Sequence, residues 1–301
     1  MKRIVLVTSS SSIHHLDIAT GEIGIIPLHI QFGDMEFLDD NIQITPESLC
    51  QMMAGNPKIK AGTRPPTADE VHEIFADLYR RNYDEVFVVS ISSRISKCYE
   101  IFQYQQSLYA GIMNVYIYDT RMGNINEGAL AYEAHCMIQG GAPFSDVIKR
   151  LDALREQSVL TFSVYSLDML IRNKKLSAPA GFVANLFDIK PVLWVDEEGY
   201  ITPRDKVRKF ERALREMIKF VDEQSRGKNR YIYMLDSCGV MGDLTNRCAD
   251  MVMSKLNLQQ LPIMPASCVS LGNHGPEGIG LGAFYGDLPK IVEKLPLFKE
   301  S

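Results

Sequence analysis

The sequence has few of the features that mark membrane, secreted or nucleic-acid-binding proteins. Its 301 residues contain no apolar run near the roughly 18 residues that a membrane-spanning helix needs. The apolar run at 4–7 is shorter than a signal-peptide core, and no small-residue cleavage pattern follows it. The formal net charge is −5, whereas a general nucleic-acid binder usually carries a basic excess. We therefore expect a cytoplasmic protein with no stable membrane insertion and at most transient surface contact.

Metal-ligand spacing is also missing. The six cysteines are scattered along the chain, and the six histidines form neither an HxxxH nor an HExxH pattern. Cysteines in a chain of this size without a secretory signal are expected to be reduced. The sequence thus indicates no disulfide framework, no zinc site and no resident cofactor.

The chain does contain a regular alternation of short apolar runs and longer amphipathic segments. The segments 3–9, 83–92 and 114–120 are rich in β-branched residues and predict strands, and helix-like patterns lie between them. This alternation is typical of a parallel or mixed sheet covered by helices. Near residue 165 the pattern changes, and a second alternation begins. We therefore expect two α/β lobes, with a ligand in the cleft between them.

Local signals predict several element boundaries. Gly33 and Asp34 offer a hairpin turn between two extended segments. Thr45 and Pro46 are typical of a helix start, with the threonine as cap and the proline at the first helical position. Thr67 predicts the start of a second helix.

Four serines lie at or just behind the strand at 83–92, and three interpretations of them are open. Ser92 and Ser93 are expected where the strand gives way to a helix. There the hydroxyls could cap the helix, or could bind a carboxylate or phosphate together with its free N–H groups. A nucleophilic serine is the third interpretation, but the stretch has no GxSxG elbow and no obvious His or Asp partner.

Two further loops are rich in hydroxyl groups. Ser9 and Ser10 follow the first strand, and Thr63 stands between Gly62 and Arg64 before two prolines. The carboxyl ends of neighbouring strands in an open α/β sheet form the usual ligand crevice. Three such loops together favour a shared anion site more than any one of them does.

A glycine-rich turn is predicted near the end of the chain, in "LGNHGPEGIGLG". It contains His274 and Gly275. Glycines let the backbone approach a ligand, and an imidazole there can donate a hydrogen bond to a carboxylate. The stretch is not a P-loop, because no GK[ST] follows, and it lacks the context of a Rossmann fingerprint.

Taken together, these segments resemble the DegV family of bacterial fatty-acid-binding proteins. The resemblance rests on "VTSSSS", "GTRPPT", "ISSRISKCY", "LDMLIRNKKLS" and "NHGPEGIG", which follow one another in family order along essentially the whole chain. Its most specific segment is "IKPVLWVDEEGYITPRDKVR". Membership would imply the two-lobe DegV (EDD) fold. That fold has an N-terminal α/β/α sandwich over 1–165 and a C-terminal α/β lobe with a mixed sheet over 166–301, whose last residues pack back on the cleft.

The resemblance also implies a function. A long-chain fatty acid would lie in a tunnel between the lobes, its carboxylate held by Thr63, Ser93 and His274. Residues expected in the neighbouring pocket are Ser9, Ser10, Gly62, Arg64, Ser92 and Gly275. No residue would be catalytic. The chain would instead present the acid to a separate ATP-binding fatty acid kinase subunit, which forms the acyl phosphate.

Several positions depart from the family pattern. Arg64 stands where the family has glutamine, and Lys97 and Cys98 stand where it has Gly-Thr. Lys175 replaces an arginine linked to partner contact or phosphoryl handling, a role that Arg172 nearby could share. Two other functions are kept as alternatives: a serine-dependent acyl hydrolase and a lipid-responsive regulatory module.

Overall fold

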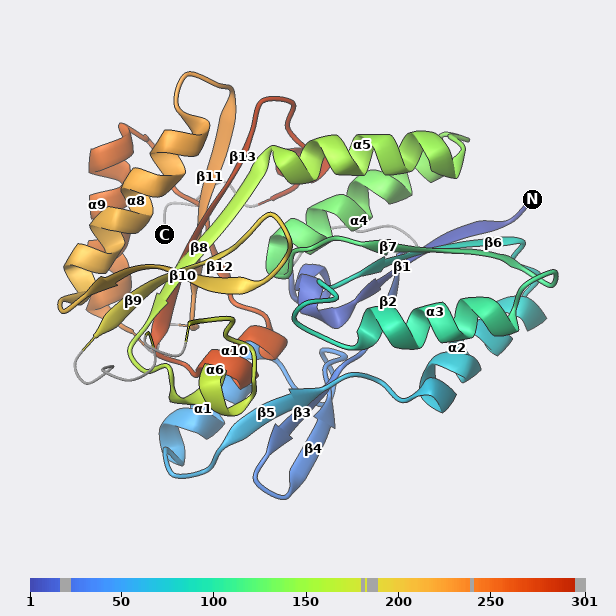
Figure 1. Cartoon of the computed structure of the whole chain (residues 1–301), viewed down its shortest axis with the longest axis horizontal. Coiled ribbons are helices and arrows are strands. Elements are labelled where there is room, and N and C mark those ends of the chain that lie inside the picture. The colour runs from blue at the N-terminus through green and yellow to red at the C-terminus, as the bar shows by residue number, and fades with distance from the viewer. Residues whose placement is uncertain (17–22, 180–181, 183–188, 239–240, 296–301) are drawn as a thin grey trace.

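The computed structural model describes residues 1–16, 23–179, 182, 189–238 and 241–295, and it contains three sheets (Figure 1). The first is a four-stranded parallel sheet in the order β2-β1-β6-β7. Its strands are β1 (Arg3–Thr8), β2 (Gly24–Ile26), β6 (Glu85–Ser90) and β7 (Asn114–Asp119). The α/β class expected from the alternation of elements is confirmed.

Helices cover both faces of this sheet because its strands are apolar on both sides. Ile4 and Leu6 pack with the residues of α2 and α3, whereas Val5 and Val7 pack with those of α4 and α5. Successive side chains of a strand point to opposite faces, so a continuous apolar run requires two covering layers. The described helices are α1 (Pro46–Gly55), α2 (Ala68–Arg80), α3 (Cys98–Leu108), α4 (Asn124–Gln139), α5 (Phe144–Glu156), α6 (Asp168–Arg172), α8 (Phe210–Ser225), α9 (Asp243–Leu256) and α10 (Cys268–His274).

The second sheet is mixed and has six strands in the order β10-β9-β8-β13-β11-β12. These strands are β8 (Ser158–Val164), β9 (Lys190–Val195), β10 (Ile201–Val207), β11 (Arg230–Asp236), β12 (Ile263–Pro265) and β13 (Gly278–Tyr285). Helices α8 and α9 cover one face. The other face contributes side chains such as Leu160 and Tyr233 to the same buried cluster as Val7 of the first sheet. The two sheets therefore share a core.

Strand β8 belongs to a different sheet from the one that its place in the sequence suggests. The boundary predicted near residue 165 puts it at the end of the first lobe, but it pairs with β9 and β13 in the six-stranded sheet. Sheet membership depends on pairing between distant segments, which the apolar pattern of one strand does not encode. The division into 1–165 and 166–301 stays a prediction.

The third sheet is small and antiparallel, with the order β4-β3-β5. It consists of β3 (His29–Phe32), β4 (Met35–Leu38) and β5 (Ala61–Arg64). The predicted hairpin is confirmed, with Gly33 at φ +62° in its turn. Helix α10, more than 200 residues away in the sequence, packs against β3, β5 and α1.

The predicted helix starts are confirmed. Thr45 caps α1 with Pro46 behind it, and Thr67 caps α2. The 3₁₀ turn η3 (Lys290–Glu293) contacts α4. The last residues of the chain were expected to pack on the cleft, but residues 296–301 lie outside the described part of the structure. Within the described part of the chain, no helix is both long and apolar enough to cross a membrane.

Candidate functional site

A largely apolar cavity lies where the first sheet ends against the face of the second. It holds about 770 Å³ of space free of protein atoms, part of it open to solvent. A mostly apolar lining with a few polar groups is typical of sites for small apolar ligands. The apolar lining includes Leu160, Phe162 and Val164 of β8, together with Val195, Ile201 and Leu235.

Alternating glycines on β13 leave room for this cavity. Gly278 and Gly280 line it, and Gly282 continues the same face of the strand. A Cβ added to Gly280 would lie 3.0 Å from Cβ of Leu235, and one added to Gly282 would collide with the ring of Tyr233. Glycine in a strand often marks a place where another group must approach closely. The period-two glycines in "GIGLG" are the sequence signal that could have revealed the cavity floor.

One wall of the cavity is formed by α10 and is polar. The glycine-rich sequence predicts a turn here, but Ser267 caps a helix of which His274 is the last residue. Asn273, which the sequence analysis missed, lines the cavity and donates from Nδ2 to Oγ1 of Thr63 at 3.1 Å. Thr63 itself does not belong to the lining and reaches the cavity through this contact. The structure thus brings Thr63 and His274 to the same wall.

The protonation of His274 follows from its contacts. Nδ1 lies 2.7 Å from the carbonyl oxygen of Gly275, so Nδ1 carries the proton and donates it. Burial lowers the pKa of His274 to about 4, and the ring of Phe162 lies 5.9 Å away. The imidazole is therefore neutral near pH 7 and presents Nε2 as an acceptor. This differs from the donor expected from the sequence.

Lys175 brings a positive charge to the cavity. It lines the cavity, and its Nζ donates to the carbonyl oxygen of Ile95 at 2.6 Å. Among the described residues, no acidic side chain forms an ion pair with it. Burial lowers the pKa of Lys175, the effect expected for a partly desolvated ammonium group. Arg172, by contrast, is exposed and donates to the carbonyl oxygen of Ala61.

The first hydroxyl-rich loop reaches the cavity through one residue. Ser10 lines it and donates to Oε2 of the buried Glu127 at 2.6 Å. Burial raises the pKa of Glu127 well above its ordinary value, against the opposing hydrogen bonds of Ser10 and Thr8. Ser9 is engaged elsewhere, since its Oγ accepts a hydrogen bond from the Leu28 amide at 3.0 Å.

Ser92 and Ser93 do not lie at a helix start. α3 begins only at Cys98, so the strand-to-helix corner expected from the sequence is an irregular turn. The hydroxyl of Ser93 donates to Oδ2 of Asp119 at 2.6 Å, and that of Ser92 donates to the carbonyl oxygen of Gly199 at 2.8 Å. Neither serine belongs to the cavity lining.

The remaining candidate residues also have partners or lie apart from the cavity. Arg64 pairs with Glu36 at 2.6 Å and with Glu70 at 3.5 Å, so its charge is neutralised within the chain. Lys97 is exposed and Cys98 is buried, and neither lines the cavity.

Gly62 and Gly275, which were expected in the pocket, lie beside the cavity. The carbonyl oxygen of Gly62 lies against Gly272 of α10, where an added Cβ would come within 3.2 Å of it. Gly275 ends the helix at φ +87°. Neither belongs to the cavity lining.

Comparison with known proteins identifies the family. The model of the family described as "Uncharacterised protein, DegV family" matches residues 3–286. The chain belongs to the DegV family. A DegV domain-containing protein of Clostridium acetobutylicum is 26% identical over 286 residues, which cover 94% of this chain and 99% of that protein.

Solved DegV structures share the fold. A fatty acid binding DegV family protein from Streptococcus agalactiae superposes with a TM-score of 0.81 at 20% identity, covering 95% of this chain and 99% of that one. A protein from Eubacterium ventriosum described as stearic-acid-binding has a TM-score of 0.76 at 22% identity, with coverage of 95% and 98%. At these identities the likeness shows the two-lobe fold.

Proposed function

We propose that this DegV-family chain binds a long-chain fatty acid, with the acyl chain in the cavity and the carboxylate against its polar wall. The observation that carries the proposal is the combination of a mostly apolar cavity with one lining cation, Lys175, that has no acidic partner in the described structure. A desolvated ammonium group favours an anionic ligand, and apolar walls favour a hydrocarbon chain. The solved relatives named above as fatty-acid- or stearic-acid-binding support the same ligand class.

Donors for the carboxylate are available on the polar wall. α10 packs against α6, and Nδ2 of Asn173 donates to the Gly272 carbonyl oxygen at 3.2 Å, which joins Lys175's segment to α10. The ammonium group of Lys175 has three donors and uses one of them. Thr63 would supply its hydroxyl after its side chain rotates away from Asn273 and toward the ligand. Ser93 stays in the proposed set, but it must exchange its bond to Asp119 for one to the ligand.

On this proposal the chain is a binding protein and does no chemistry alone. A separate ATP-binding kinase subunit would phosphorylate the presented carboxylate, with Lys175 and Arg172 near the phosphoryl group. The hydrolase alternative draws no support from Ser93, whose hydroxyl donates to a carboxylate rather than to a histidine. A regulatory module whose lipid is never passed on predicts that no such kinase uses the complex.

Native mass spectrometry tests the binding proposal. Protein purified from cells without detergent is expected to carry one added mass in the range of long-chain fatty acids, which organic extraction removes. Delipidated protein should then bind palmitate or oleate by calorimetry. Protein that is purified empty, stays folded and binds neither acid would contradict the proposal.

Binding is expected to take up a proton. A carboxylate beside His274 favours the imidazolium and raises its pKa above the value of about 4 in the free protein. Between the free and the bound pKa the complex holds one more proton, so affinity falls as pH rises through that window and levels off above it. Calorimetry in buffers of different ionisation enthalpy should report this uptake.

The matched control is His274→Gln, which keeps a donor but does not titrate. It is expected to bind with a weaker pH dependence. An unchanged slope would assign the dependence to the carboxyl group of the fatty acid itself and would contradict a role for His274.

A further inference from the structure

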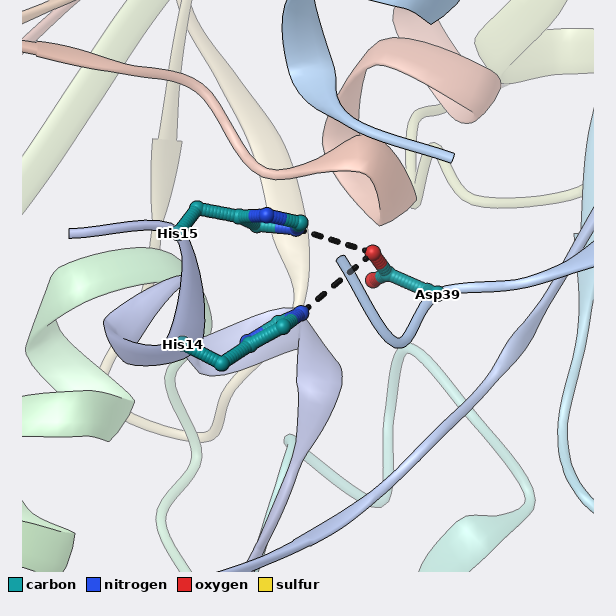
Figure 2. Close-up of side chains that lie close together, drawn as sticks. All are labelled: His14, His15 and Asp39. Atoms are coloured by element: carbon teal, nitrogen blue, oxygen red, sulfur yellow. Dashed lines mark hydrogen bonds and ion pairs between the residues drawn. The ribbon is translucent and has the colours of Figure 1, made fainter. Parts of the chain in front are cut away.

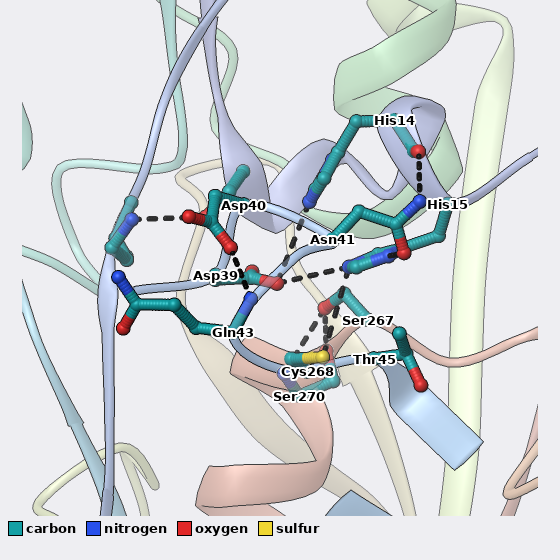
Figure 3. A network of polar contacts seen from close by, with 12 residues as sticks. His14, His15, Asp39, Asp40, Asn41, Gln43, Thr45, Ser267, Cys268 and Ser270 are labelled. Atoms are coloured by element: carbon teal, nitrogen blue, oxygen red, sulfur yellow. Dashed lines mark hydrogen bonds and ion pairs between the residues drawn. The ribbon is translucent and has the colours of Figure 1, made fainter. Parts of the chain in front are cut away.

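Apart from the cavity, a second group of side chains with ligating atoms converges in the core of the described structure. It consists of His14, His15, Asp39 and Cys268, called here the His–Asp–Cys cluster (Figures 2 and 3). The residues come from three separate places: the 3₁₀ turn η2 (Ile13–His15), the end of β4, and the first turn of α10. Their distance in the sequence explains why no spacing pattern reveals the cluster.

The ligating atoms point to one place. Nε2 of His15 lies 2.9 Å from Oδ1 of Asp39 and 3.7 Å from Sγ of Cys268. Nε2 of His14 lies 3.4 Å from the same Oδ1. Ligand atoms around a tetrahedral zinc ion are separated by about 3.3 Å between nitrogen or oxygen atoms and about 3.6 Å between nitrogen and sulfur. The separations between His14, His15 and Asp39 are close to such edges, and these three ligand atoms all lie within 4.8 Å of one another. Sγ of Cys268 contacts Nε2 of His15 but lies outside that group of three, so it would have to move closer to serve as the fourth ligand.

The tautomer of His15 leaves a lone pair facing this place. Nδ2 of Asn41 donates to the backbone oxygen of His14 at 3.3 Å, which turns the Asn41 carbonyl oxygen toward Nδ1 of His15 at 3.0 Å (Figure 3). Nδ1 of His15 therefore donates to the Asn41 oxygen, and Nε2 faces Oδ1 of Asp39. Metal-bound histidines typically donate their second ring nitrogen to such an acceptor.

Burial makes a compensating cation necessary. The side chains of His15 and Asp39 are 1% and 0% exposed, and Cys268 is also 0% exposed. The second carboxylate oxygen, Oδ2, has no hydrogen-bond partner in the described structure. A buried carboxylate of this kind is costly unless a positive charge lies next to it.

A catalytic Cys–His–Asp relay does not fit the geometry. In such a relay the two ring nitrogens face different partners, the carboxylate and the nucleophile. Here the same Nε2 of His15 faces both Asp39 and Cys268. A single proton on that nitrogen would satisfy one of these contacts, whereas a metal ion would satisfy all of them at once.

We propose that the His–Asp–Cys cluster binds one zinc ion. Two imidazoles, a carboxylate and a thiolate are a ligand set that zinc accepts, and four protein ligands would make the site closed and structural. The ion would join η2 and β4 to α10, the helix that also presents Asn273 and His274 to the cavity. The proposal uses none of the cavity residues and does not depend on the ligand of the cavity.

Untagged full-length protein tests the site without any substitution. Metal analysis after purification in zinc-supplemented medium is expected to show one zinc per chain, and zinc added to chelator-treated protein should raise Tm by about 5 °C. Cobalt(II), which takes zinc sites, should give tetrahedral visible bands and a thiolate charge-transfer band in the near ultraviolet. Chelator-treated protein that shows neither a Tm shift nor a cobalt spectrum would overturn the proposal.

Two variants identify the ligands. Cys268→Ser is expected to lose the charge-transfer band and to bind cobalt more weakly, and His15→Ala is expected to lose the cobalt spectrum. The control is His72→Ala, which removes an exposed histidine on α2 and should leave both properties unchanged. A wild-type cobalt spectrum without the thiolate band, or an equal effect of His72→Ala, would overturn the assignment.

Discussion

Replacement of Gly280 by valine is expected to reduce fatty-acid affinity about 100-fold while the chain stays folded. Gly280 lies on the cavity floor, and its added Cβ would lie 3.0 Å from Cβ of Leu235. Because Leu235 also lines the cavity, valine at this position would have to displace the Leu235 side chain, which would reshape the space proposed for the acyl chain. A β-branched residue suits the backbone of a strand, but the tight contact with Leu235 adds a folding cost of about 1–3 kcal/mol.

Titration calorimetry with palmitate and thermal unfolding of the unliganded protein separate these two effects. Gly55→Val is the matched control, because a Cβ at this last residue of α1 meets no atom within 4 Å. Gly280→Ala adds only the Cβ and should weaken binding to an intermediate degree. Wild-type affinity in a folded Gly280→Val protein would place the acyl chain outside this cavity.

Lys175→Met is expected to weaken fatty-acid binding by about 30-fold or more, since the carboxylate would lose its desolvated cationic partner. The same change should leave the unliganded protein at least as stable at neutral pH. Burial lowers the pKa of Lys175, so the folded state disfavours its charge, and methionine avoids that cost with a side chain of similar length. The lost hydrogen bond to the Ile95 carbonyl oxygen opposes this gain. The expected signature is a lower affinity for the fatty acid together with an equal or higher stability of the unliganded protein.

A fatty alcohol of equal chain length isolates the charge. Wild-type protein and Lys175→Met should bind the alcohol with similar affinity, and only the acid should distinguish them. Lys174→Met, which removes the exposed neighbouring charge, is the matched control and should bind the acid like wild type. Equal losses for acid and alcohol in Lys175→Met would show that the lysine supports the cavity by packing and does not bind the carboxylate.

The elements of the fold could be predicted because their signals are local. The apolar runs of β1 and β6, the hairpin at Gly33 and the caps at Thr45 and Thr67 each depend on residues only a few positions apart. The motif order along the chain also indicated the DegV family, which the family match confirms.

The residues that line the candidate site could be predicted only in part. His274 and Ser10, which the sequence predicted to lie near the ligand, line the cavity. Thr63 does not line it but accepts a hydrogen bond from Asn273, which does. Asn273 was missed because the cap at Ser267 was not recognised as the start of α10. Ser93 donates to Asp119 because α3 begins five residues later than the corner that the sequence suggested.

By itself, the sequence determined the α/β class, several helix and strand boundaries and the family, since periodicity, caps and motifs act over short distances along the chain. Tertiary structure alone decided that β8 joins the second sheet and that the glycines of β13 open a cavity. It also decided that Lys175 lines that cavity without an acidic partner among the described residues, and that His15 contacts both Asp39 and Cys268. These features depend on contacts between segments up to more than 200 residues apart, and burial in those contacts sets the charge and hydrogen-bonding state of each group.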